Sequence, residues 1–106
     1  MLGPTGHSDS FTRDRLPKAK DWPVIDATRF NYPEWLNVGV ELTDRMVDRG
    51  FGDHTALIGN GRSRTYKELA DWSNRIAHAL VEDYGVKPGN RVLIRSANNP
   101  AMVAAW

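Results

Sequence analysis

The stretch that decides the fold runs from Thr65 to Pro100 and reads "TYKELADWSNRIAHALVEDYGVKPGNRVLIRSANNP". It opens with the pattern of a capping box, in which the Thr65 side chain accepts from the amide three residues on while Glu68 reaches back to the Thr65 amide. Apolar side chains then recur at three- and four-residue steps, which predicts a helix with one apolar face that a sheet or another helix must cover. These side chains are Leu69, Trp72, Ile76 and Leu80.

The second half of this stretch predicts a turn, a strand and a new helix. "KPGN" places Pro88 and Gly89 at the two central positions of a type II turn. "RVLIR" (91–95) then reads as a buried strand, and the order strand, helix, strand implies a right-handed crossover and a parallel pair. "ANNP" (97–100) offers an asparagine cap and a proline in the first turn, so that another helix begins there.

Upstream of Thr65, the sequence predicts a helix followed by a hairpin. The helix has Asn37 as its cap and Gly50 as its stop, because glycine adopts the left-handed conformation without steric cost. Strands at 55–58 and 63–65 flank the pair Asn60-Gly61, and both of these residues tolerate the positive φ of a tight hairpin turn.

Residues 1–36 carry prolines and glycines among polar residues, without helical or alternating periodicity. We expect an extended leader that packs on the domain through Trp22, Phe30 and Tyr32, although the same aromatics could form a ligand wall. Residues 37–106 are expected to form the opening segment of an α/β domain, because two strands and a helix cannot cover their own faces. The fold class is therefore α/β, with a β-hairpin followed by helix, strand and helix, and it is incomplete at the C-terminus.

Composition excludes several classes of function. The chain has 106 residues, of which 41% are hydrophobic and 25% charged, as in soluble globular domains. Its net charge of +1 lacks the basic footprint of a nucleic-acid binder. With no cysteine, no signal peptide and no apolar run long enough to cross a bilayer, the sequence predicts a cytoplasmic protein that binds neither nucleic acid nor membrane.

The motifs of phosphate, metal and nucleophilic sites are missing from the sequence. Neither GxGxxG nor GxxxxGK[ST] occurs, and "GFGDH" (50–54) reads as a plain turn. His7, His54 and His78 have no helical spacing that would let two imidazoles share a metal, so no metal site and no catalytic residue is predicted. His78 is expected to pack at the flank of the apolar helix face.

The best candidates for ligand binding are Ser96, Asn98 and Asn99, which follow the predicted strand 91–95. Ligands of open α/β sheets gather at the carboxyl ends of strands. Two interpretations stay open: these residues contact a ligand, or Asn98 or Asn99 only caps the helix that follows.

The residues from Thr55 to Trp106, "TALIGNGRSRTYKELADWSNRIAHALVEDYGVKPGNRVLIRSANNPAMVAAW", resemble the N-terminal region of the adenylate-forming (AMP-binding) enzymes. This superfamily holds acyl-CoA synthetases, peptide-synthetase adenylation domains and luciferases. The leader "LPKAKDWPVID" (16–26) with "YPEWLNVGVELTDRMVDRG" (32–50) is most similar to the benzoate and aminobenzoate CoA ligases.

The resemblance implies that the intact protein is an AMP-forming acid-CoA ligase that uses ATP, Mg²⁺ and coenzyme A. A carboxylate would attack ATP to give an acyl-adenylate and pyrophosphate, and the CoA thiol would then displace AMP. The family's phosphate loop, acidic motif and C-terminal lysine have no counterpart in this chain, so no catalytic residue is carried over from the family. We expect an inactive first part of a longer enzyme, interrupted within a helix, that self-associates; the alternative is a stand-alone interaction module that retains only the scaffold.

Overall fold

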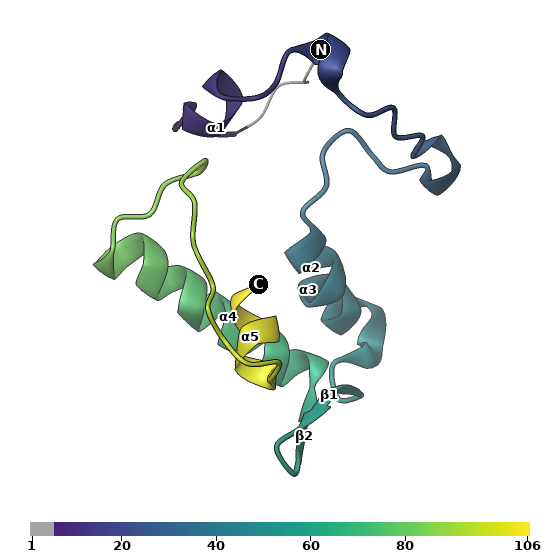
Figure 1. Ribbon diagram of the computed structural model, residues 1–106. Helices are drawn as coiled ribbons and strands as arrows, with labels where there is room; N and C mark the ends of the chain where they lie inside the picture. Colours follow the sequence, from purple (N-terminus) through teal and green to yellow (C-terminus); the bar gives the residue numbers. More distant parts are fainter. Residues whose placement is uncertain (1–5) are drawn as a thin grey trace. The chain divides into compact units, whose positions relative to one another are not determined.

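The computed structural model describes residues 6–106, so residues 1–5 of the predicted leader lie outside it (Figure 1). The described chain divides into two compact units. The larger unit consists of Asn37–Gly85 and Val92–Trp106, and the smaller one joins the leader up to Leu36 with Val86–Arg91.

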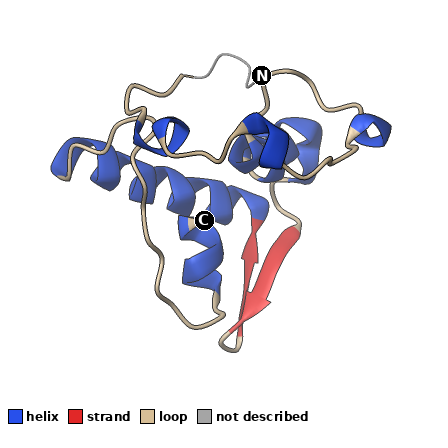
Figure 2. Cartoon of the chain, turned by 45° about the horizontal axis from the view of Figure 1, so that its top comes forward, coloured by secondary structure: helices blue, strands red, loops and turns tan. Residues whose placement is uncertain are grey.

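The predicted hairpin is confirmed in the larger unit. Strand β1 (Thr55–Gly59) pairs antiparallel with β2 (Arg62–Thr65), as Figure 2 shows. Asn60 and Gly61 link the strands with φ values of 54° and 71°. Both residues therefore occupy the left-handed region that the Asn-Gly pair predicts.

The capping box is also confirmed, and it starts helix α4 (Tyr66–His78). The Glu68 amide donates to Thr65 Oγ1 at 3.2 Å, and the Thr65 amide donates to Glu68 Oε2 at 2.8 Å. Because the first amides of a helix have no partner within the helix, this reciprocal pair satisfies a donor that would otherwise be unpaired.

The loop before the hairpin satisfies the two preceding amides of α4. The Tyr66 amide donates to the His54 carbonyl at 3.1 Å, and the Lys67 amide donates to the Gly52 carbonyl at 3.0 Å. Gly50 has the left-handed φ of 86° expected there, but it lies at a kink inside the segment Val47–Phe51, which ends one residue later than predicted. The "GFGDH" stretch is thus a turn whose carbonyl groups hold the start of α4.

The helix predicted from Asn37 to Gly50 is not continuous. Asn37 caps it as expected, since Asn37 Oδ1 accepts from the Val40 amide at 3.2 Å. The helix then breaks at Thr43, where φ is −123° and ψ −83°. The pieces are α2 (Val38–Leu42), α3 (Asp44–Met46) and the π-helical η3 (Val47–Phe51).

The break has a local cause in the Thr43 hydroxyl. Its Oγ1 lies 2.7 Å from the Gly39 carbonyl oxygen and 2.8 Å from Asp44 Oδ2, so one proton serves two acceptors. A threonine hydroxyl that bonds to the carbonyl four residues earlier competes with the helical ladder and bends helices. Thr43 is buried with an exposed fraction of 8%, which holds the bend in place.

Three helices form the core of the larger unit. Helix α4 continues as η4 (Ala79–Asp83) up to Gly85, and α5 (Pro100–Ala105) begins at Asn99. Both α3 and α5 pack against α4, as Figures 1 and 2 show for α5. Helices α3 and α5 therefore cover part of the apolar face of α4. The buried apolar side chains are those of Leu69, Ala70 and Ala104, whereas Trp72, Ile76 and Leu80 remain half-buried.

The strand predicted at 91–95 is wrong. Within residues 6–106 the sheet has two strands, both in the antiparallel hairpin, so the predicted parallel pair does not form. Leu93 is 92% exposed instead of buried. A strand needs a neighbour for its amide and carbonyl groups, and the only described strands already pair with each other. The α/β class is confirmed, whereas this strand within it is not.

The smaller unit contains short helices and one turn. The helices are α1 (Phe11–Asp14), η1 (Ala19–Asp21) and η2 (Thr28–Phe30). The "KPGN" turn is confirmed, because the Asn90 amide donates to the Lys87 carbonyl at 3.0 Å and Gly89 has φ 94°.

The leader aromatics have partners close by in the sequence. Phe30 and Tyr32 stack on each other with ring centroids 5.4 Å apart, and the Trp22 indole donates to the Pro17 carbonyl at 2.8 Å. Packing of the leader on the domain stays a prediction.

Asp9 fastens the start of the leader to the 86–91 turn inside this smaller unit. Its carboxylate accepts from the Phe11 amide at 2.9 Å and from Asn90 Nδ2 at 2.7 Å, and it pairs with Arg91 at 3.0 Å. These contacts, the Phe11 amide above all, lower the pKa of Asp9. Gly89 lies so close that a Cβ there would collide with the Asp9 carbonyl oxygen.

Candidate functional site

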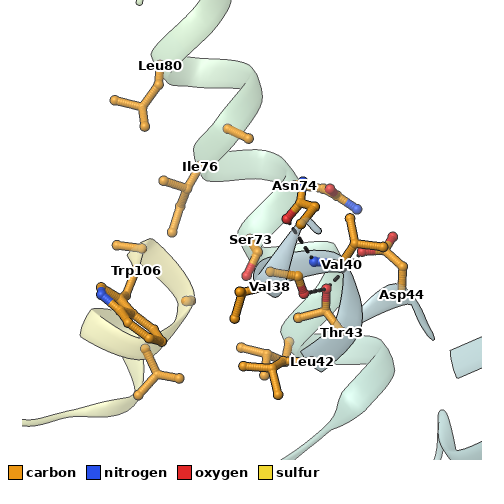
Figure 3. A pocket seen from close by; sticks show the side chains of 17 residues that line it. Val38, Val40, Leu42, Thr43, Asp44, Ser73, Asn74, Ile76, Leu80 and Trp106 are labelled. Carbon is orange, nitrogen blue, oxygen red and sulfur yellow. Dashed lines mark hydrogen bonds between the residues drawn. The ribbon is translucent and has the colours of Figure 1, made fainter. Parts of the chain in front are cut away.

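The larger unit has an apolar groove between its helices (Figure 3). It encloses about 400 Å³ and is lined by residues of α2, α3, α4 and α5. Val38 and Leu42 face it from α2, Ile76 from α4, Leu80 from η4, and Trp106 from the end of α5. Trp106 remains 84% exposed, so the groove is open at that side chain.

The chemistry of this groove is that of an apolar packing surface. Among the described residues that line it, Asp44 alone carries a titratable side chain, and its Oδ2 is hydrogen-bonded to Thr43. Nucleophilic and acid–base catalysis both require a second group within hydrogen-bond reach. Thr43 Oγ1 and Asp44 Oδ2 are 2.8 Å apart in this lining, but Thr43 is buried and its hydroxyl also bonds to the Gly39 carbonyl, so this pair stabilises the bend of the helix. The groove can bury apolar surface.

The structure brings together two of the three residues predicted as ligand contacts. Asn99 Nδ2 donates to Ser96 Oγ at 3.3 Å, while Ser96 Oγ donates to the Ala97 carbonyl at 2.9 Å. Asn99 Oδ1 accepts from the Met102 amide at 3.0 Å and so caps α5. Asn98 is exposed and takes no part in this hydrogen-bonded pair. A ligand role for these residues stays a prediction.

Sequence analysis missed a smaller cavity between the hairpin, α4 and the start of α5. It encloses about 320 Å³, and its lining includes Arg62, Arg64, Trp72 and Asn99. The Arg64 guanidinium lies 4.6 Å from the centre of the Trp72 ring. The sequence contains a signal for the two arginines, because residues two apart on a strand share one face and the Asn-Gly turn fixes where β2 begins.

The described histidines and carboxylates do not gather into one cluster. Within residues 6–106 no group of three His, Cys, Asp or Glu side chains could hold a metal ion. The packing role expected for His78 is wrong, since its side chain is exposed and its Nδ1 lies 3.2 Å from Glu82 Oε1. The glutamate one helical turn later draws the imidazole toward solvent. The described part of the chain also contains no helix that is long and apolar enough to cross a membrane.

Comparison with known proteins places these elements in a family. A sequence profile described as AMP-binding enzyme matches residues 45–106. The chain is 38% identical over 71 residues to 3-hydroxybenzoate–CoA/4-hydroxybenzoate–CoA ligase of Thauera aromatica, covering 67% of this chain and 13% of that protein. It is 39% identical over 90 residues to acetyl-coenzyme A synthetase of Streptomyces avermitilis, covering 80% of this chain and 14% of that protein.

The chain belongs to the AMP-binding enzyme family, because the profile covers more than half of its residues. The resemblance to adenylate-forming enzymes is thereby confirmed, and hydroxybenzoate–CoA ligases are among its relatives. The chain spans 13% and 14% of the length of the two relatives described above. No solved structure matches it significantly.

Proposed function

We propose that this chain forms the opening segment of an ATP-dependent acid-CoA ligase that makes an acyl-adenylate and then an acyl-CoA thioester. The observation that carries the proposal is the family match over residues 45–106, which covers the hairpin, α4 and α5. The relatives named above are CoA ligases and synthetases of aromatic acids and acetate. The substrate class we propose is therefore an aromatic or other small organic acid, together with ATP and coenzyme A.

We propose that the site for the cofactors is formed by residues outside this chain. No described cluster of side chains would hold Mg²⁺, and the sequence has no glycine-rich phosphate loop. No step of the reaction is therefore assigned to a residue of this chain. Its role in the proposed enzyme is that of a scaffold on which an active site elsewhere depends.

The decisive experiment reads the source gene past the codon for Trp106 and assays its full product. An open frame with a Ser/Thr/Gly-rich loop followed by Pro-Lys, whose product releases pyrophosphate with ATP and benzoate, a hydroxybenzoate or acetate, supports the ligase. A stop codon directly after Trp106 would favour a stand-alone interaction module instead.

The 106-residue chain alone is expected to be inactive. We expect no pyrophosphate release with any of these acids and no micromolar ATP binding in isothermal titration. Pyrophosphate release by the chain would contradict the scaffold role.

The chain is also expected to self-associate. Its exposed large apolar side chains include Leu93 and Trp106. At about 25 cal/mol per Å², a few hundred Å² of uncovered apolar surface amounts to several kcal/mol, comparable with the stability of a small domain. Sedimentation velocity with a hydrophobic dye added in parallel tests this, and a compact monomer that binds no dye would contradict it.

A further inference from the structure

We propose that the cavity between the hairpin, α4 and the start of α5 binds a small oxyanion, a phosphate or carboxylate group, through Arg62 and Arg64. Both arginines lie on β2 two residues apart, so their side chains leave the strand on the same face. Both line this cavity of about 320 Å³, and no Asp or Glu is among its described lining residues. The site is separate from the apolar groove and does not depend on the proposed ligase activity.

The two guanidinium groups have no carboxylate partner among the described residues. The ion pairs found there involve Arg45, His78 and Arg91, and neither Arg62 nor Arg64 takes part in them. Like charges that face one cavity repel each other, and an oxyanion between them removes this cost. Arginine also presents its donors in a fixed fork that matches carboxylate and phosphate oxygens.

The cavity is preformed on one side by aromatic stacking and on another by close packing. The Arg64 guanidinium lies 4.6 Å from the Trp72 ring centre, which limits its rotation. Gly59 lies against Pro100, since a Cβ on Gly59 would come within 2.8 Å of Pro100 Cγ. A larger residue at position 59 would therefore push the hairpin away from α5 and open the cavity.

The test is isothermal titration of the whole chain with inorganic phosphate and, separately, with sodium benzoate, both at constant ionic strength. We expect saturable binding of at least one of them. Arg62→Gln should weaken that binding about tenfold, as expected for a lost charge-assisted hydrogen bond. Arg75→Gln, a charge removal on the exposed side of α4, should leave it unchanged.

Two further variants keep the result interpretable. Arg64→Gln removes the contact with Trp72 and could loosen the fold, so its circular dichroism is measured first. Arg62→Lys keeps the positive charge of an exposed side chain but lacks the forked donors of a guanidinium group. We expect Arg62→Lys to bind more weakly than the unmodified chain but better than Arg62→Gln. The phosphate and benzoate arms distinguish the two kinds of oxyanion. Absence of binding in both arms, or equal losses for Arg62→Gln and Arg75→Gln, would overturn the proposal.

Discussion

Residues 52–78 and residues 92–98 belong to the same unit, but they differ in where their partners lie. In 52–78 the turn, the capping box and the amides of α4 all find partners within a short stretch of chain. In 92–98 the apolar side chains predict a buried strand, yet Leu93 is almost fully exposed. The first region contains the hydrogen-bond partners that its structure requires. The second would need a neighbouring strand in order to form a strand itself.

The difference separates interactions between residues close in sequence from interactions that need a distant partner. Capping and turn formation depend on hydrogen bonds between residues a few positions apart. Strand formation depends on a partner that satisfies every second amide and carbonyl group along its length. An apolar run alone therefore does not define a strand.

The largest expected effect comes from the same substitution made in both regions. Leu69→Ala removes a buried side chain and should lower the free energy of unfolding by about 2–5 kcal/mol. Leu93→Ala removes an exposed one and should change it by less than about 0.5 kcal/mol. Urea denaturation followed by circular dichroism measures both, and similar losses would erase the distinction between the two regions.

The hairpin turn offers a second test of whether residues close in sequence determine the structure of the first region. Gly61 has φ 71° with open space around its Cα, so Gly61→Ala should cost about 1–2 kcal/mol through backbone strain alone. Ser63→Ala on β2 is the control and should stay within about 0.5 kcal/mol. If Gly61→Ala left the urea midpoint unchanged, the turn would not require a left-handed residue there.

The helix cap should show a smaller effect. Thr65→Ala should lower stability by about 1 kcal/mol through loss of the acceptor for the Glu68 amide. Because Glu68 caps in return, the double variant with Glu68→Ala should cost less than the sum of the two single variants. Strict additivity in this cycle would mean that the two hydrogen bonds are independent.

The smallest effect concerns pH and the leader. Contacts with Phe11, Asn90 and Arg91 hold the pKa of Asp9 below its ordinary value of 3.8. The attachment of the leader to the turn should therefore be complete at neutral pH and be lost as the pH falls through this lowered pKa.

Asp9→Asn should mimic the low-pH state at pH 7. Trypsin cleavage after Arg15 should then become faster, while the exposed substitution Asp71→Asn on α4 should not change it. Equal cleavage rates for Asp9→Asn and the unmodified chain would show that Asp9 does not hold the leader.

The elements that were predicted correctly depend on local signals. Asn37 and Asn99 cap their helices, and the Asn60-Gly61 turn forms as expected. The break at Thr43 was missed because a hydroxyl that bonds four residues back looks the same in sequence as one that faces solvent. The parallel strand was predicted from order along the chain, which cannot supply a partner.

The candidate site was predictable in part. The hydrogen bond between Ser96 and Asn99 agrees with their expected proximity, but sequence alone could not separate capping from ligand contact. The sequence could have placed Arg62 and Arg64 on one face of β2, but the other walls of their cavity, Trp72 and Asn99, come from elements distant in sequence. Only packing brings such residues together.

The start of α4 has a consequence for the order of events during protein synthesis. Every group that accepts from the Tyr66, Lys67 and Glu68 amides lies earlier in the chain, on Gly52, His54 and Thr65. A ribosome makes the chain from its N-terminus, so these acceptors have left the exit tunnel before the helix they hold. The packing of α4 against α5 forms last, because α5 is made after α4. The nascent chain thus positions the first turn of α4 before the packing of that helix can be completed.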